Sequence, residues 1–283
     1  MSDGSVPQPP RALVLGAVSR DLARPDASDA RPGGVVVHAG EALARLGART
    51  RVVTRVRGED AAALLAPLEA AGVEIRALPS RTTTTYVNDY STAIDRHVLL
   101  AASESIRPED VPIDWRAADL VQLGPLHPMD VLPETVAVLS GLRGIDLQGL
   151  VRVPGVDGAS LRAEPILAAL LAHVDVVQVS EHELPAVLSG ESLDRFVARH
   201  AIDELIVTRG ARGATVLTRG EATEVPAAPA VPRAKVGAGD VFLATYLVLR
   251  VRGAGPVAAA CEAARTAALK VEHGGIAPRR GRS

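Results

Sequence analysis

Short apolar runs alternate with helix-like segments along most of this 283-residue chain. Each apolar run is bounded by Gly, Asp or Arg and is short enough to be a buried strand. Such alternation favours a mostly parallel sheet covered by helices, because parallel strands need crossover connections. The expected strands are residues 13–15, 51–56, 120–123, 174–179 and 204–207.

Helices are expected between these strands, and a hairpin and a long helix are expected after them. The expected helices are residues 39–46, 61–71, 131–139, 166–172, 184–188, 193–200 and, rich in alanine, 257–272. The hairpin is expected at residues 214–225, around Arg219-Gly220. Ligands of such sheets bind at the carboxyl ends of the strands, so we expect the site in the loops that follow them.

Two stretches interrupt the alternation. Residues 23–32 are rich in Pro, Asp and Arg, and residues 74–102 consist of successive strand-like runs with no helix between them. An antiparallel patch inserted in a parallel protein is commonly a cover over the site. We therefore expect a disordered leader (1–10), a small β lid (23–34 and 73–102) and an α/β core (11–22, 35–72 and 103–283).

The composition excludes several classes of protein. A formal net charge of −2 and 2% aromatic residues give no basis for nucleic-acid binding. The apolar runs are too short to span a bilayer, and residues 1–10 have no apolar signal segment. A single cysteine, Cys261, suits a reducing compartment. We expect a cytoplasmic protein with no membrane or nucleic-acid partner, for which a homodimer is an allowed state.

A compact glycine loop near the C-terminus carries most of the functional information. It reads Val236-Gly237-Ala238-Gly239-Asp240 and leads directly into an apolar helix. Two glycines let the backbone approach an anion, and the helix start adds the positive end of its dipole. A carboxylate at a phosphate site suits a general base that accepts a proton from an attacking hydroxyl, which is the role expected of Asp240. The alternative is an ordinary loop in which Asp240 caps the helix.

Three further motifs accompany the glycine loop in order along the chain. Gly33-Gly34 precedes a helical segment, Ser180-Glu181-His182-Glu183 follows a strand, and Thr208-Arg209-Gly210-Ala211-Arg212-Gly213 follows another. Together the four motifs resemble those of the ribokinase (PfkB) family of sugar and nucleoside kinases over nearly the whole chain. The resemblance implies a ribokinase-like three-layer core with a mostly parallel central sheet and a small β-sheet lid. It also implies transfer of the ATP γ-phosphoryl group to a hydroxyl, with Mg²⁺.

The resemblance assigns roles on the acceptor side. It implies that Gly237, Ala238 and Gly239 form an anion hole beside the base Asp240. Asp21, in a turn after the first strand, is expected to accept hydrogen bonds from substrate hydroxyls. The remaining expected acceptor contacts are Gly33, Gly34, His38 (where the family usually has Asn), Asn88 and Arg96.

The resemblance also assigns the donor side. Ser180 replaces the Asn of the family's Asn-x-x-Glu motif, and Glu183 is expected to act on the metal through water. Thr208, Gly210 and Gly213 are expected to line the nucleotide phosphates. Gln148 and Arg152, which follow Asp146 at a strand end, are expected to face the transferred phosphate.

The identity of the acceptor is left open by the sequence. Polar residues on the expected lid suit a sugar, a sugar acid or an inositol, and one Trp, three Tyr and two Phe make a nucleobase sandwich hard to build. A nucleoside kinase and a kinase-fold binding protein with weakened catalysis are the alternatives. A dinucleotide-dependent enzyme is disfavoured because no Gly-x-Gly-x-x-Gly turn follows the first strand.

The residues before the glycine loop bear on cation dependence. Ala234 and Lys235 stand where the family usually has Asp-Thr, and that Asp belongs to a monovalent-cation site. We hypothesise that the Lys235 ammonium replaces the exchangeable cation in the nucleotide site. The alternative is that Lys235 points into solvent and the cation site is lost.

The Lys235 hypothesis predicts indifference to potassium. Replacing potassium by tetramethylammonium at fixed ionic strength should leave the steady-state rate of the wild-type enzyme unchanged, because the charge is built in. Lys235→Ala should lose activity. Strong activation of the wild type by potassium would contradict the hypothesis, and full activity of Lys235→Ala would leave only the solvent-exposed alternative.

Overall fold

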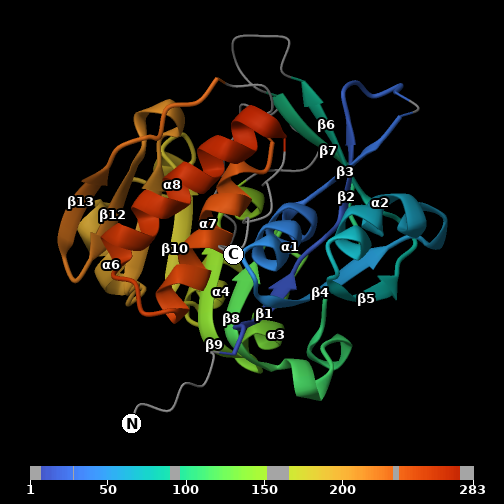
Figure 1. The fold of residues 1–283 in the computed structure, drawn as a ribbon, viewed down its shortest axis with the longest axis horizontal. Helices are drawn as coiled ribbons and strands as arrows, with labels where there is room; N and C mark the ends of the chain where they lie inside the picture. Colours follow the sequence, from blue (N-terminus) through green and yellow to red (C-terminus); the bar gives the residue numbers. More distant parts are fainter. Residues whose placement is uncertain (1–7, 28, 90–95, 152–165, 232–235, 275–283) are drawn as a thin grey trace, which may run out of the picture.

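The computed structural model describes residues 8–27, 29–89, 96–151, 166–231 and 236–274 (Figure 1). Two sheets are present, and the larger has nine strands in the order β13-β12-β11-β10-β9-β8-β1-β4-β5. Its strands are β1 (Arg11–Leu15), β4 (Arg49–Val56), β5 (Glu74–Pro79), β8 (Ala117–Leu123), β9 (Ser140–Asp146), β10 (Val176–Ser180), β11 (Glu204–Thr208), β12 (Ala214–Thr218) and β13 (Glu221–Val225). All pairs from β5 to β11 are parallel, and β12 and β13 add an antiparallel hairpin.

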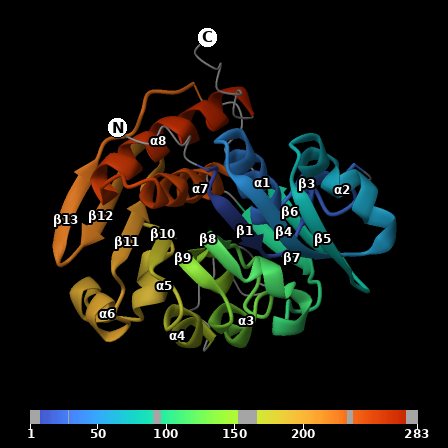
Figure 2. The ribbon, with the colours of Figure 1, turned by 60° about the horizontal axis from the view of Figure 1, so that its bottom comes forward.

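Helices cover both faces of the large sheet, which confirms the three-layer prediction (Figure 2). One face carries α1 (Val35–Arg45), α2 (Gly58–Ala70), α7 (Ala238–Val251) and α8 (Pro256–His273). The other carries α3 (Pro133–Ala137), α4 (Ile166–Leu171), α5 (Leu184–Leu188) and α6 (Leu193–Arg199). In the described part of the chain, no helix is long and apolar enough to cross a membrane.

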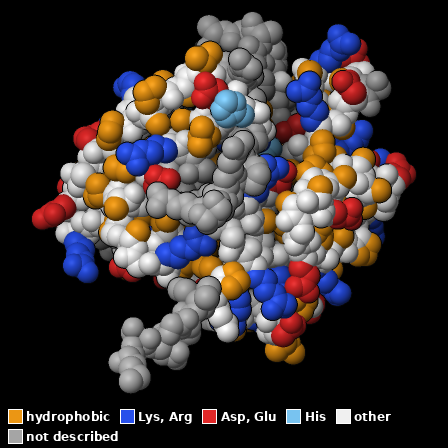
Figure 3. Space-filling model, in the orientation of Figure 1, with side chains coloured by type: hydrophobic (Ala, Val, Ile, Leu, Met, Phe, Trp, Pro, Cys, Tyr) orange, Lys and Arg blue, Asp and Glu red, His pale blue; other side chains and the backbone are white. Residues whose placement is uncertain are grey.

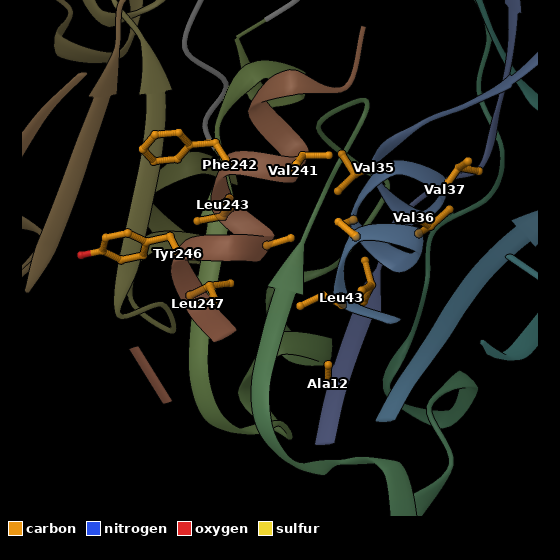
Figure 4. Close-up of a cluster of buried hydrophobic side chains, with 14 of the residues drawn as sticks. Ala12, Val35, Val36, Val37, Leu43, Val241, Phe242, Leu243, Tyr246 and Leu247 are labelled. Carbon is orange, nitrogen blue, oxygen red and sulfur yellow. The ribbon is translucent and has the colours of Figure 1, made fainter. Parts of the chain in front are cut away.

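The central strand β1 shows why its sequence is continuously apolar. Ala12 and Val14 belong to the hydrophobic cluster on the α1/α7 side, and Leu13 and Leu15 belong to the cluster on the opposite side. Both faces of the strand are therefore buried, as is usual for parallel sheets. On the first side, α1 and α7 pack against each other, with α1 over β1 and α7 over β8 and β9 (Figure 4). The starts of these two helices are thereby held close together.

The smaller sheet has the order β3-β2-β6-β7. Its strands are β2 (Ser19–Leu22), β3 (Arg31–Gly33), β6 (Thr84–Asp89) and β7 (Arg96–Ala101). β2 lies parallel to β6, whereas β3 and β7 are antiparallel to their neighbours. Residues 1–7 of the expected leader lie outside the described residues.

Two boundaries differ from the expected division into core and lid. β5, expected in the lid, is the edge strand of the large sheet, because α2 is an ordinary crossover that returns the chain parallel to β4. β2, expected in the core, belongs to the small sheet. The chain leaves β1 at Gly16, which has φ 152° and would place a Cβ 2.4 Å from the carbonyl oxygen of Gly124. This tight turn sends β2 out of the large sheet.

The strand β9 was missed, and residues 131–139 form a shorter helix than expected, α3. β9 has the sequence Ser-Gly-Leu-Arg-Gly-Ile-Asp, which lacks a continuous apolar run. A Cβ on Gly144 would lie 2.9 Å from the Leu247 side chain on α7, so a larger residue would require that side chain to shift. Packing of a helix against the strand, which the local pattern cannot reveal, therefore selects a residue with low strand propensity.

The helix α7 is anchored to β11 through a buried polar cluster. The Tyr246 hydroxyl donates to Glu204 at 2.5 Å, and the Arg250 guanidinium donates to both oxygens of the same carboxylate. Glu204 is 8% exposed. A carboxylate that is this well supplied with donors fixes the position of α7 along the sheet.

This cluster predicts two different losses of stability. Tyr246→Phe should lower the free energy of unfolding by about 1 kcal/mol, because one hydrogen bond is lost and Glu204 keeps its arginine. Glu204→Ala should lower it by about 2–3 kcal/mol, because the Tyr246 hydroxyl and Arg250 both lose their acceptor. Urea denaturation followed by circular dichroism measures both values. Equal losses would contradict the arrangement.

Candidate active site

A cavity opens where the carboxyl ends of the central strands meet the small sheet and the start of α7. On the face of the molecule in Figure 3, acidic and basic side chains are interspersed. The cavity lining combines backbone from glycine turns with polar side chains. The lining residues are Ser19, Asp21, Gly34, His38, Tyr86, Asn88, His97, Leu126, Asp146, Gln148, Gly149, Val236, Gly237, Ala238, Gly239 and Asp240.

The glycine loop forms the start of α7. Gly237 is the N-cap residue, with φ 78°, and its carbonyl accepts the Val241 N–H at 3.0 Å. The amides of residues 238–240 therefore precede the first intrahelical hydrogen bond and point out of the helix end, where an anion is favoured. Asp240 is 5% exposed and lies in the first turn of α7, after the N-cap. The alternative in which Asp240 is the N-cap residue is wrong, because Gly237 holds that position and Asp240 follows it in the helix.

His38, on α1, lies directly against this loop. A Cβ on Gly237 would be 2.3 Å from the ring of His38, so this glycine is required both by its positive φ and by the imidazole. Burial, together with the smaller effect of the charge of Lys270, lowers the pKa of His38 to about 3. The imidazole is therefore neutral, with one donor and one acceptor nitrogen. Neither nitrogen has a hydrogen-bond partner in the described residues, which suits a hydroxyl ligand.

Asp21 lines the cavity from the strand β2. Its Oδ1 accepts from the Ser19 hydroxyl at 2.6 Å. Burial raises the pKa of Asp21, and hydrogen bonds from Ser19 and Asn88 oppose the shift. Gly33 has no space for a side chain, because a Cβ would lie 2.3 Å from the Asp21 carboxylate. Gly34, by contrast, contributes to the cavity lining, as expected for a backbone contact.

The strands β6 and β7 of the small sheet contribute three further side chains to the cavity. Asn88 was expected there, and its Oδ1 lies 2.7 Å from Nδ1 of His97. Tyr86 also lines the cavity, and its hydroxyl donates to the carbonyl of Leu126. Sequence reasoning missed Tyr86 and His97. Tyr86 could have been found, because it is two residues from Asn88 and shares its face of the strand.

The carboxyl end of β9 brings a further carboxylate into the cavity. Asp146 Oδ1 accepts the Gln148 N–H at 2.9 Å, and Oδ2 accepts from Gln178 Nε2 at 2.5 Å. Gln178 Nε2 also lies 3.0 Å from the carbonyl oxygen of Gly239. Gln148 was expected at this site, whereas Asp146 was noted only as part of its motif and Gln178 was missed. A glutamine inside a fully buried strand was the available signal.

The expected donor-side residues meet at the ends of β10 and β11. Ser180 pairs in register with Thr208, and its hydroxyl donates to the Glu183 carboxylate at 2.7 Å. Gly210 and Gly213 flank a short turn, with φ 55° and 89°. This group is absent from the described lining of the cavity and lies at the same carboxyl edge of the sheet.

Three expected site residues cannot be located fully. Arg152 and Lys235 lie outside the described residues, and for Arg96 only its place in β7 is described. Among the residues that the structure describes, no group of three or more His, Cys, Asp or Glu side chains is placed to hold a metal ion. Glu183 is 5% exposed and could contribute a carboxylate through water.

Comparison with known proteins identifies relatives at the level of family and fold. The family model "pfkB family carbohydrate kinase" matches residues 12–279. A pyrophosphate-dependent kinase in the ribokinase family, solved with a pyrophosphate analog and myo-inositol, is 23% identical with a TM-score of 0.80 and covers 95% of this chain and 97% of its own. Ribokinase from Thermotoga maritima is 17% identical with a TM-score of 0.74, covering 95% and 97%. No curated protein matches.

A fructokinase from Vibrio cholerae O395, solved with fructose, ADP and potassium ion, is 21% identical with a TM-score of 0.77, covering 95% of each chain. At these identities the structures establish a common fold. They support the same mostly parallel central sheet that the alternation of strands and helices predicts.

The raised pKa of Asp21 predicts that replacing this residue increases the stability of the fold and weakens binding of the acceptor. At a pH between its unfolded and folded pKa values, the unfolded carboxyl loses its proton first, so folding becomes less favourable as pH rises. Asp21→Asn should therefore raise the melting temperature at neutral pH, and the gain should vanish as the pH falls to where the wild-type carboxyl is protonated. The same variant should raise the acceptor KM about tenfold or more while changing the donor KM less than about twofold.

Asp119→Asn is the matched control for this measurement. Asp119 is a surface carboxylate whose pKa is lowered by its hydrogen bond and charge interaction with Arg11. Its substitution should reduce stability slightly at neutral pH and leave the acceptor KM unchanged. A fall in melting temperature for Asp21→Asn, or equal effects on both KM values, would show that Asp21 is structural.

Proposed function

Because the chain belongs to the pfkB family of carbohydrate kinases, we propose that it transfers the γ-phosphoryl group of ATP to a hydroxyl of a small polyhydroxy compound. The observation that carries the proposal is the position of Asp240. Its carboxylate lines the cavity beside the amides at the start of α7, with hydroxyl-binding groups on the other walls. A base and an anion site next to one another are what transfer to a hydroxyl requires.

The proposed reaction uses this chain's residues as follows. Asp21, Asn88 and His38 bind the hydroxyls of the acceptor and orient one hydroxyl toward Asp240. Asp240 accepts the proton of that hydroxyl as it attacks phosphorus, and the amides of Ala238 and Gly239 stabilise the charge on the transferring group. The small sheet covers the acceptor and limits hydrolysis of the donor by water.

The donor side is proposed from the remaining residues. Thr208, Gly210 and Gly213 bind the donor phosphates, and Ser180 orients Glu183. Mg²⁺ bound with ATP would neutralise charge on the donor phosphates, and the Glu183 carboxylate would hold one of its waters. The expected roles of Arg152, Arg96 and Lys235 in the site stay predictions.

The charge of the cavity narrows the acceptor class. Asp21, Asp146 and Asp240 line it, and the described lining residues include no Lys or Arg. A phosphorylated sugar or a sugar acid would be repelled by these carboxylates without a compensating cation. The lining therefore favours an uncharged polyol, a sugar or an inositol, over a sugar acid.

Pyrophosphate is a second candidate for the donor. Two solved structures with TM-scores of 0.80 and 0.79 are described as pyrophosphate-dependent kinases, one in complex with myo-inositol and the other a myo-inositol-1 kinase converted to a myo-inositol-3 kinase. The anion site at the start of α7 contacts only phosphate in the proposed reaction, so its geometry suits either donor. Release of ADP or of inorganic phosphate distinguishes the two.

The proposal also includes the location of the enzyme in the cell and its partners. The enzyme acts in the cytoplasm, where ATP is abundant and the single Cys261 stays a thiol. Its partners are the acceptor and the donor, and a homodimer stays a prediction that light scattering on the purified chain measures.

Substitution of the base tests the function directly. With a panel of uncharged sugars and inositols and with ATP or pyrophosphate, the wild-type enzyme should release ADP or phosphate in an acceptor-dependent way. Asp240→Asn should lower kcat by about 10²-fold or more and leave donor affinity largely intact, because proton acceptance matters only in the transition state. Asp119→Asn should retain wild-type kcat.

Two outcomes would count against this reading. Wild-type kcat in Asp240→Asn would remove its assignment as the base. A wild-type protein that binds acceptor and donor in calorimetry, with no product from either donor, would be a binding protein with the kinase fold.

A further inference from the structure

Two buried glutamines on the large sheet contact the first turn of α7 from below. Gln122 on β8 is 0% exposed and Gln178 on β10 is 1% exposed. The strand β9 lies between them in the sheet. Both side chains donate through Nε2 to main-chain carbonyls of α7, Gln122 to that of Asp240 at 3.1 Å and Gln178 to that of Gly239 at 3.0 Å.

These two hydrogen bonds act on different peptide groups. The carbonyl of Gly239 shares its peptide unit with the N–H of Asp240, which belongs to the outward-pointing amides of the helix start. The carbonyl of Asp240 shares its peptide unit with the N–H of Val241, which already donates to Gly237 at 3.0 Å. Only Gln178 therefore acts on a peptide whose N–H points toward the anion site.

Asp146 fixes the orientation of the Gln178 amide. Gln178 Nε2 lies 2.5 Å from Asp146 Oδ2 and 3.0 Å from the carbonyl oxygen of Gly239, so both contacts use the donor end of the amide. A flipped amide would place Oε1 against a carboxylate and a carbonyl, which is repulsive. The carboxylate thus keeps the donor end directed at the 239–240 peptide.

The second glycine of the loop fits closely against this pair. A Cβ on Gly239 would lie 3.3 Å from Gln178 Nε2 and 3.5 Å from Asp146 Oδ2. The Gln178 and Asp146 side chains thus lie directly beneath this glycine, and a Cβ there would require Gln178 to move by a few tenths of an ångström.

We propose that Gln178 is a positioning residue for the anion site, held by Asp146, which fixes and polarises the 239–240 peptide so that its N–H is directed at the phosphoryl group. The inference rests on the proposed phosphotransfer function and extends it to residues behind the loop. A hydrogen bond to a carbonyl strengthens the donor on the same peptide by roughly 10–30%. Loss of one amide donor at such a site typically costs about 10²–10³-fold in kcat, and a misdirected amide costs part of that.

The test compares the matched variants Gln178→Met and Gln122→Met. Both replace a buried glutamine by a side chain of similar length without a donor, and both remove one bond to the first turn of α7. Gln178→Met should lower kcat by about 10-fold or more, with the acceptor KM within about twofold. Gln122→Met should lower kcat by less than about threefold. Equal kcat values in the two variants would overturn the proposal.

A glutamate at the same position supplies a pH readout that simple misfolding would not produce. Protonated Glu in Gln178→Glu can donate one hydrogen bond, whereas ionised Glu repels the Asp146 carboxylate and the Gly239 carbonyl. The kcat of Gln178→Glu relative to wild type should therefore rise as the pH falls, and the ratio for Gln178→Met should be flat. A flat ratio for both would count against the role of the donor.

Pyrophosphate binding separates failure of this inference from failure of the proposed function. Calorimetry of the folded proteins with inorganic pyrophosphate should show an affinity at least about fivefold weaker for Gln178→Met than for wild type, with Gln122→Met within about twofold. This comparison holds even if the wild-type enzyme turns over none of the tested acceptors. Equal pyrophosphate affinities in all three proteins would refute the proposal, whatever the acceptor is.

Discussion

The position of the first turn of α7 over the carboxyl edge of the large sheet is the constraint on which the site depends. Gln178 donates to the Gly239 carbonyl in this turn, and Glu204 holds the following turns through Tyr246 and Arg250. A helix start can bind an anion wherever its amides are exposed, but transfer chemistry needs these amides at one fixed distance from the acceptor. The buried polar groups on the sheet supply that fixity, because an apolar contact alone would allow the helix to slide.

The cavity combines two kinds of wall with different physical behaviour. On the side of α7 the groups that face the cavity are backbone amides, Asp240 and the neutral imidazole of His38. On the side of the small sheet they are the side chains of Asp21, Asn88 and His97. Burial raises the pKa of Asp21, which means that the ionised carboxylate is destabilised in the cavity. Hydrogen bonds from hydroxyl ligands can offset this loss of free energy. The buried Asp21 carboxylate thus lowers the stability of the fold and serves to bind the acceptor, a combination that is common at binding sites.

Features that depend on residues close together in the chain could be predicted from the sequence, and features that depend on distant contacts could not. The loop at Gly237 could be interpreted from its own residues, because a helix start with glycines acts through its own amides. The strand β9 could not be found, since its glycines interrupt the apolar pattern and Gly144 packs closely against Leu247 on a helix far along the chain. The strand β5 was also assigned to the wrong sheet. A strand-like run in the sequence does not indicate which other strand it pairs with.

The sequence by itself determined the layered α/β fold and the glycine loop with Asp240, because each depends on residues close together in the chain. Asp21 was expected in a turn and lies on the strand β2. The tertiary structure alone decided which polar groups share the cavity. Asp146 and His97 line it from separate elements, Gln178 lies behind the glycine loop, and no local pattern indicates what each of them contacts. Hydrogen bonds between strands and a helix join residues far apart in the chain. Gln178 and Gly239, for example, are 61 positions apart. Such contacts follow from the packing of whole elements, which no local pattern encodes.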